Sequence, residues 1–479
     1  MTSPQSRPIL VLTTEPLPLP GCPTTGAGLR AWGLAEGLRA RGFDVVIAAP
    51  DYEAQSQGAC EHSKTGQRVR HQVSRPSHVR LFKRGDVGRL LAELNPATVV
   101  LQHWGMAREV PELSVPLVID LAGPHLLERM YWGETNIDRN FSEKLDALRR
   151  ADFITCSGYY QRHYFHAFIA LAGFDLRECE IPVIPFSVPP LYDFLADMSA
   201  PHTPCADPTD IRFVYGGAFL AWQDPSKALI WLLEEMERAG IGRLEFYGGA
   251  HPIADVSGGK FAGLLKILAS HPCVTMRGYV PFDQLLANYR KCSVALDLMA
   301  RNPERELAFT TRTLIYLYCG LPVIHNNYSE LSDIIRGHNC GWTLDPDDEE
   351  SFRKTIRSIL TCHAPLASLR GNAIRAASEY AWDKTIDPLA CFCATPRMRA
   401  GKTEKLLAIE AQIRNADSIR AERDAVRTEL DTIRGKLLFR IQNRLPRLAP
   451  LAAPFVWLCA WPVVAWLMIL FRNRQRKSE

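Results

Sequence analysis

The stretch from Phe309 to Asn326 (FTTRTLIYLYCGLPVIHN) limits the fold of this chain most strongly. Arg312–Tyr318 has apolar residues at helical spacing with no helix breaker among them. Gly320 follows where a helix can end with a positive φ angle, which costs little only for glycine. Pro322 prevents the helix from continuing, and Val323–Ile324 then indicates a short buried strand. The pattern predicts a helix–glycine–strand unit of an α/β protein.

The residues at the start of this predicted helix are suited to bind phosphate. Thr311, Arg312 and Thr313 place two hydroxyls and a guanidinium where the unpaired backbone N–H groups of a helix N-terminus converge. The spacing alone is equally compatible with an ordinary helix–strand unit of any α/β protein.

The N-terminal part predicts the first unit of a doubly wound parallel sheet. A buried strand over 9–12 is followed by a loop, a helix over 27–41 and a strand over 44–49. Ligands bind beyond the carboxyl ends of such strands, where the loop lies. Gly26 and Gly28 let backbone N–H groups approach a ligand at the start of the helix, although glycines also occur in plain connectors.

Polar residues follow two further predicted strands of this part. The strand over 97–102 leads into His103, and the strand over 115–119 is followed by Asp120 and, five residues later, His125. Side chains just past buried strands can face a cleft. We therefore expect Asp120, His125 and His103 to be active-site residues, and the alternative is that His125 only begins a helix after Pro124.

A second doubly wound unit is predicted from residue 211 onward. The segment over 191–210 is rich in Pro, Asp and Thr and has no periodic pattern, which is typical of a linker. IRFVYGG then indicates a strand, the next helix carries one apolar face, and LEFYGG indicates another strand. A chain of 479 residues is long enough for two such cores and a C-terminal tail.

Several segments together resemble the bacterial retaining glycosyltransferases of family 4 (group 1), which have the two-domain GT-B fold. The matching segments are GAGLRAWGLAEGLRARGFDV, VIPFSVPP and YCGLPVIHNNYSEL, and they fall within about the first 390 residues. The resemblance implies two Rossmann-like domains that face a cleft, and a nucleoside diphosphate sugar as the donor. It also implies that the glycine-rich loop contacts acceptor and donor phosphate, that Gly217 lies at the donor, and that the backbone of Tyr279 and Val280 faces the nucleotide base.

The sequence departs from this family at two places. Family members carry an Arg and a Lys after the first glycines of the second domain, whereas GGAFLAWQDPSK has only Lys227. The negative charge on the leaving diphosphate must still be neutralised, and Arg312 and Lys227 are the candidate cations for this role. The second glutamate of the family motif is replaced by Ile315, and Glu304 and Glu306 are the nearby carboxylates that could bind sugar hydroxyls.

Composition excludes several other classes. The formal net charge of +4 is small for this length and does not suggest a nucleic-acid partner. Thirteen cysteines occur without a CxxC pair, which argues against a zinc module or a disulfide framework and fits a reducing cytosol. The N-terminus has no signal-peptide pattern. We expect no metal ion and no cofactor besides the donor sugar nucleotide.

The C-terminal tail predicts assembly and membrane attachment. Residues 403–440 carry apolar residues at heptad intervals, which indicates a coiled coil that could form a homo-oligomer; the alternative is a lone surface helix. Residues 448–471 form an uncharged run with basic flanks, long enough to span a bilayer. Three prolines and the symmetric flanks equally fit a re-entrant or interfacial segment.

The sequence therefore predicts an acceptor domain over 1–190, a linker over 191–210, a nucleotide-sugar domain over 211–379 and a crossover back to the first domain over 380–400. The predicted function is transfer of a sugar to a lipid-linked or saccharide acceptor in cell-surface polysaccharide synthesis, such as lipopolysaccharide, at the cytoplasmic face of the inner membrane. Two alternatives stay open: a catalytically degenerate GT-B scaffold subunit and a nucleotide-sugar epimerase.

Overall fold

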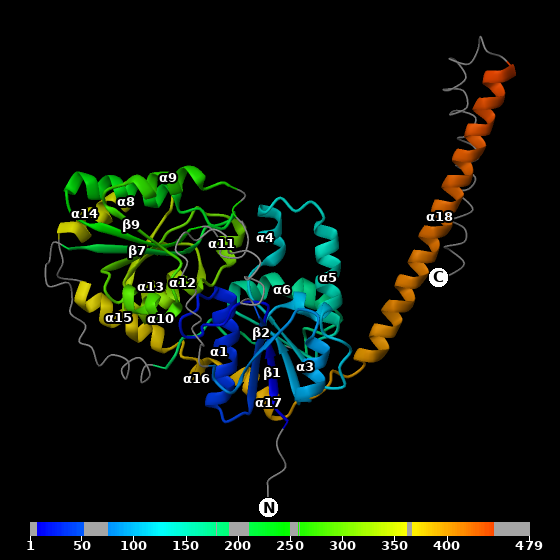
Figure 1. Ribbon diagram of the computed structural model, residues 1–479, viewed down its shortest axis with the longest axis horizontal. Helices are drawn as coiled ribbons and strands as arrows, with labels where there is room; N and C mark the ends of the chain where they lie inside the picture. Colours follow the sequence, from blue (N-terminus) through cyan, green and yellow to red (C-terminus); the bar gives the residue numbers. More distant parts are fainter. Residues whose placement is uncertain are drawn as a thin grey trace, which may run out of the picture. The chain divides into compact units, whose positions relative to one another are not determined.

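The computed structural model describes residues 7–51, 75–178, 180–190, 210–249, 257, 259–361 and 366–444. The chain divides into two compact units, residues 1–402 and 403–479. The first unit contains two parallel six-stranded sheets, each flanked by helices (Figure 1). These two sheets confirm the predicted pair of doubly wound halves.

The first sheet has the strand order β3-β2-β1-β4-β5-β6, and every pairing in it is parallel. Alternate residues of β1 point to opposite faces: Ile9 and Val11 enter one hydrophobic core, and Leu10 and Leu12 enter the other. Its strands are β1 (Ile9–Leu12), β2 (Val45–Pro50), β3 (Val79–Phe82), β4 (Thr98–Leu101), β5 (Leu117–Leu121) and β6 (Phe153–Cys156). Its helices are α1 (Gly26–Ala40), α3 (Val87–Leu94), η1 (Trp104–Arg108), α4 (His125–Tyr131), α5 (Ile137–Arg149) and α6 (Tyr159–Leu171).

The second sheet repeats this order as β9-β8-β7-β10-β11-β12. Helices α8, α9 and α14 cover one face and α12, α13 and α15 the other, as Figure 1 shows. Its strands are β7 (Arg212–Ala218), β8 (Arg243–Gly249), β9 (Val274–Gly278), β10 (Val294–Asp297), β11 (Val323–Asn326) and β12 (Gly341–Leu344). Its helices are α8 (Ser226–Ala239), α9 (Ala262–Ser270), α10 (Phe282–Tyr289), α11 (Pro303–Leu307), α12 (Thr311–Tyr318), α13 (Glu330–His338), α14 (Glu349–Thr361) and α15 (Leu366–Ser378).

The helix–glycine–strand unit predicted from the sequence is confirmed as α12 and β11. Gly320 has φ of 72°, so the chain reverses there in the left-handed region and β11 starts three residues later. Leu314 and Leu317 are fully buried. The Tyr316 hydroxyl accepts a hydrogen bond of 2.7 Å from the backbone N–H of Gly216, which fixes the helix against the end of β7.

The chain returns to the first half after α15, through α16 (Trp382–Thr385) and α17 (Asp387–Ala394). Two backbone hydrogen bonds join this return to Val188: its N–H donates to Tyr380 at 2.9 Å, and its carbonyl accepts from Trp382 at 3.0 Å. Leu389 is fully buried in the core that α1 also lines. Residues 380–394 therefore pack against α1.

The C-terminal tail is described only up to residue 444. Helix α18 (Lys402–Arg444) covers the region predicted as a coiled coil, and the helix is confirmed, whereas its pairing stays a prediction. The predicted membrane segment over 448–471 lies outside the described residues. Among the described helices, none has a stretch that is long and apolar enough to cross a bilayer.

We predict that Gly37→Ala lowers the free energy of unfolding by about 1–2 kcal/mol, because an added Cβ would lie 2.9 Å from Ile386 and from the Trp382 carbonyl. Gly88→Ala is the matched control, since a Cβ there meets nothing within 4 Å and the helix gains up to about 1 kcal/mol. Urea unfolding of both variants measures the difference. Equal stabilisation by both would contradict the packing of the return segment on α1.

Candidate active site

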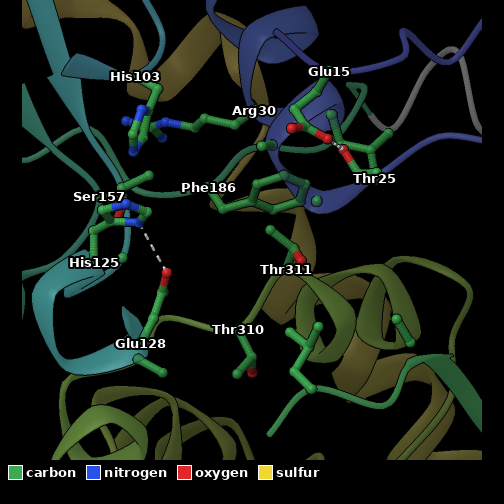
Figure 2. A pocket seen from close by; sticks show the side chains of 18 of the residues that line it. Glu15, Thr25, Arg30, His103, His125, Glu128, Ser157, Phe186, Thr310 and Thr311 are labelled. Atoms are coloured by element: carbon green, nitrogen blue, oxygen red, sulfur yellow. Dashed lines mark hydrogen bonds and ion pairs between the residues drawn. The ribbon is translucent and has the colours of Figure 1, made fainter. Parts of the chain in front are cut away.

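A cleft of about 770 Å³ lies between the two halves of the first unit. It is lined by the loop after β1, by the segments after β4 and β5, by the end of β7 and by the start of α12. These are the carboxyl ends of the central strands, where each sheet reverses its strand order and where doubly wound folds bind ligands. Figure 2 shows His125 and Glu128 on the wall of the first half, with Thr310 and Thr311 on the wall of the second half.

The structure brings most of the predicted site residues to this cleft and leaves the others outside it. Those that line it are Gly26, His103, His125, Gly217, Tyr279, Glu304, Thr311 and Arg312. Those that do not are Gly28, Asp120, Lys227, Val280, Glu306 and Thr313.

Asp120 is a buried structural carboxylate, which corrects its expected position after the strand. It lies inside β5 and is fully buried. Arg30 donates to both its oxygens, at 2.8 and 3.0 Å, and the Thr155 hydroxyl donates at 2.6 Å. Arg30 also donates to the carbonyl of Pro185 at 2.7 Å. All of these contacts are internal, so Asp120 holds Arg30, and Arg30 is the member of the pair that lines the cleft.

His125 is held as a neutral imidazole. Its Nε2 accepts a hydrogen bond of 3.0 Å from Arg129, so its proton is on Nδ1, which faces Glu128 Oε2 at 3.4 Å (Figure 2). Burial lowers the pKa of His125 to about 3, and the charges of Arg129 and Lys144 act in the same direction. The ring of His103 lies 4.9 Å from that of His125, and burial also lowers the pKa of His103 well below its ordinary value. Both histidines therefore serve as neutral hydrogen-bonding groups.

Glu128 is a cleft residue that the sequence analysis missed. It follows His125 by three residues on α4, and only this one-turn spacing could have pointed to it. Its carboxylate lies over Gly123, where a Cβ would be 2.7 Å from Oε1 and where φ is +79°, so only glycine fits. Burial raises the pKa of Glu128 to about 7, against the opposing charges of Arg305, Lys144 and Arg129. Glu128 can therefore change its charge near neutral pH.

Arg312 presents a fixed cation at the start of α12. Its side chain donates to Asp297 at 3.1 Å, to Gln223 at 2.9 Å and to the Tyr215 hydroxyl at 3.3 Å. A Cβ at Gly217 would lie 2.8 Å from Arg312 Nη2, and this glycine has φ of +125°. Glycine at position 217 therefore leaves the space that the guanidinium occupies. The helix N-terminus adds unpaired N–H groups at the same place.

The two halves meet closely beside this cation. A Cβ at Gly26, the first residue of α1, would lie 2.8 Å from the Thr311 hydroxyl at the start of α12. Gly28 instead packs on its own loop, where a Cβ would lie 2.0 Å from the Pro16 carbonyl oxygen. Thr313 is buried and donates its hydroxyl to Asp297. The starts of both helices therefore border the same part of the cleft.

Three other predicted donor-binding side chains, Lys227, Glu304 and Glu306, form ion pairs within the protein. Lys227 is exposed and pairs with Asp347 at 2.6 Å, and Glu306 pairs with Arg301 at 2.7 Å. Glu304 lines the cleft, but both its oxygens accept from the neighbouring Arg305. Val280 packs against the core of the second half. Ile315, at the position of the missing family glutamate, lines the cleft with an apolar side chain.

The second half of the first unit matches the model of a known protein family. Residues 211–362 match the family model described as "Glycosyl transferases group 1". A comparison with curated protein sequences finds no match.

Solved structures of similar fold cover both halves. Sucrose-phosphate synthase from Thermosynechococcus elongatus matches with 15% identity and a TM-score of 0.57, over 81% of this chain and 98% of that chain. The trehalose-6-phosphate synthase OtsA matches with 11% identity and a TM-score of 0.57, over 82% of this chain and 100% of that chain. Anabaena Alr3699/HepE, solved with UDP and glucose, matches with 13% identity and a TM-score of 0.53, over 81% of this chain and 99% of that chain.

The fold of the first unit is therefore the GT-B fold. Together with the group 1 domain in its second half, this fold places the chain among the glycosyltransferase enzymes. The Rossmann-like halves and the cleft between them agree with this class.

We predict that Asp120→Ala lowers the free energy of unfolding by about 3–5 kcal/mol, because it leaves the Arg30 guanidinium buried and unpaired. Arg89→Ala, which breaks an exposed ion pair with Glu93, is the control and should change the free energy of unfolding by less than about 0.5 kcal/mol. Chemical denaturation measures both. A fully stable Asp120→Ala variant without enzymatic activity would instead make Asp120 a catalytic residue.

We predict that Glu128→Gln removes a pH dependence of stability. The native carboxyl, with its raised pKa of about 7, keeps its proton while the unfolded carboxyl loses its proton near pH 4.5, so the wild-type protein loses stability between these values as pH rises. Relative to Glu128→Gln, the free energy of unfolding of the wild-type protein should be lower by roughly 2–3 kcal/mol at pH 7.5.

Denaturation at pH 5 and pH 7.5 checks this, with Glu93→Gln on the exposed surface of α3 as the control. A stability difference between wild type and Glu128→Gln that is the same at both pH values would show that the carboxyl is not perturbed.

Proposed function

We propose that the chain transfers a sugar from a nucleoside diphosphate sugar to a saccharide or lipid-linked acceptor, with the diphosphate held at the start of α12. The observation that carries this proposal is Arg312, fixed by Asp297 beside a helix N-terminus in the cleft of a group 1 glycosyltransferase domain. A guanidinium and unpaired backbone N–H groups at one place are suited to bind phosphate oxygens.

The donor is placed across the end of the second sheet. Its diphosphate rests against Arg312 and Thr311, with Gly217 giving the backbone clearance. The base lies towards Tyr279, which lines the cleft, and the sugar points towards the first half. UDP is the first nucleotide to test, because Alr3699/HepE was solved with UDP.

The chemistry we propose is retaining transfer. The bond between the anomeric carbon and the diphosphate oxygen breaks, and the acceptor oxygen forms a bond to the same face of that carbon. The leaving phosphate takes the proton of the acceptor hydroxyl, so no protein nucleophile is needed. Arg312 stabilises the charge that develops on the diphosphate, and the neutral His125 is a hydrogen-bonding group at the sugar end of the cleft.

The C-terminal residues are the basis for the acceptor and the cellular location that we propose. We propose that the uncharged run over 448–471 attaches the enzyme to the cytoplasmic face of the inner membrane, where lipid-linked saccharides of cell-surface polysaccharides are assembled. The heptad pattern over 403–440 supports a homo-oligomer through the coiled coil. Neither a metal ion nor another cofactor enters this proposal.

The alternative of a catalytically degenerate scaffold is favoured by one observation. Ile315 lines the cleft where the family has a sugar-binding glutamate, and the nearby Glu304 is paired with Arg305. A scaffold would bind the sugar nucleotide without turning it over. Release of UDP from UDP-sugars by the purified full chain separates the two functions.

We predict that Arg312→Gln weakens UDP binding by roughly ten- to hundredfold, the loss of one charge-assisted contact worth about 1.5–3 kcal/mol. Lys227→Gln is the matched control: it also removes a cation from the second half, but an exposed one that pairs with Asp347 outside the cleft. Titration calorimetry with UDP measures both.

Arg312→Lys is a second control that keeps the charge beside Asp297. The melting temperature of each variant reports whether it is folded. Equal weakening by Lys227→Gln, or unchanged UDP binding by a folded Arg312→Gln variant, would place the diphosphate elsewhere.

A further inference from the structure

Among the described residues, one arginine of the cleft forms no ion pair. Five of the described arginines line the cleft, and four of these have a carboxylate partner: Arg30 with Asp120, Arg108 with Glu143, Arg305 with Glu304 and Arg312 with Asp297. The fifth, Arg129 of α4, forms no ion pair with any residue that the structure describes.

Arg129 is nevertheless held in one position. Its Nε donates to His125 Nε2 at 3.0 Å, and its guanidinium carbon lies 5.0 Å from the centre of the Trp132 ring. The imidazole is neutral and the indole is uncharged, so neither contact cancels the charge. In the described part of the chain, its two Nη groups make no hydrogen bond. Arg129 therefore combines a fixed geometry with unused donors.

A second basic group, Lys144, acts on the same two residues as Arg129 does, namely His125 and Glu128. Lys144 of α5 is fully buried, and within the described ranges its Nζ has no hydrogen-bond partner and no carboxylate within ion-pair distance. Its Nζ lies 4.3–5.3 Å from the ring centres of Tyr164, Phe165 and Phe168. Burial lowers the pKa of Lys144 to about 7, against the charge of Glu128. The carboxyl whose charge acts on Lys144 is that of Glu128, which faces His125 at 3.4 Å.

A buried guanidinium without a counter-charge destabilises the ligand-free protein and favours an anionic ligand. A cation removed from water needs a counter-charge, and the other four arginines of the cleft receive theirs from the protein. A planar guanidinium with free N–H groups matches the oxygens of a phosphate or a carboxylate. Among the described residues no carboxylate fills this role for Arg129, which leaves its Nη groups available to an anionic ligand.

We infer that Arg129 binds an anionic group, a phosphate or a carboxylate, that the saccharide substrate carries. The inference rests on the proposed function, because it takes the ligand of this cleft to be a sugar. We take this group to differ from the donor diphosphate, which the proposed function assigns to Arg312 on the second half, whereas Arg129 lies on the first half. It belongs either to the acceptor or to the sugar of the donor.

Titration calorimetry on the full chain tests the inference with defined probes. Inorganic phosphate and glucose 6-phosphate are titrated with and without saturating UDP, glucose being the neutral counterpart. UDP-glucuronate is compared with UDP-glucose. The variants are Arg129→Gln, the conservative Arg129→Lys, and Arg89→Gln as a charge-matched control on the exposed surface of α3.

We expect a charged probe to bind more tightly than its neutral counterpart, and Arg129→Gln to weaken that probe by roughly tenfold or more with UDP binding unchanged. Arg129→Lys should retain part of the affinity, and Arg89→Gln all of it. Dependence of the phosphate probes on Arg129 assigns the anion to the acceptor, and dependence of UDP-glucuronate assigns it to the donor sugar.

The inference is overturned if every charged probe binds a folded Arg129→Gln variant as tightly as wild type, or if no charged probe exceeds its neutral counterpart. Failure of the proposed function has a separate signature, the absence of UDP and UDP-sugar binding. The phosphate titrations without nucleotide still report on Arg129 in that case.

Discussion

The ion pair between Arg312 and Asp297 is the interaction on which the donor site depends. Asp297 ends β10 and is almost fully buried, so its carboxylate cannot move towards solvent, and it holds the guanidinium at 3.1 Å beside the start of α12. A fixed cation loses little conformational entropy when a phosphate binds. The positive φ of Gly217 and the ring of Tyr215 complete the space that the side chain occupies.

The first half supplies a wall of different character. Arg30 links α1, β5 and the backbone at Pro185, just before the chain leaves this half, so the first wall and the connection to the second half share one buried network. Beyond this network lie two neutral histidines, Glu128 and the unpaired Arg129. The first half thus pairs Arg30 and Arg108 with carboxylates of its own, whereas Arg129 has no such partner among the described residues.

The sequence was sufficient for the fold and for the start of α12, because helix spacing, Gly320 and the buried strand after it act locally. Asp120 was misplaced because strand length depends on pairing with β6, which extends β5 past it. Lys227 was predicted because the family resemblance implies cations after the first glycines of the second domain, yet its partner Asp347 is 120 residues away. Glu128 has no motif, since its raised pKa arises from burial, against the opposing charges on α4, α5 and α11, and these elements meet only in three dimensions.

A crystal structure of the full chain with UDP tests the central claim most directly. The diphosphate is expected within hydrogen-bonding distance of the Arg312 guanidinium and the first N–H groups of α12, with Asp297 still paired to the arginine. A diphosphate bound at Lys227, or anywhere that leaves the start of α12 without a phosphate, would contradict this assignment of the donor site.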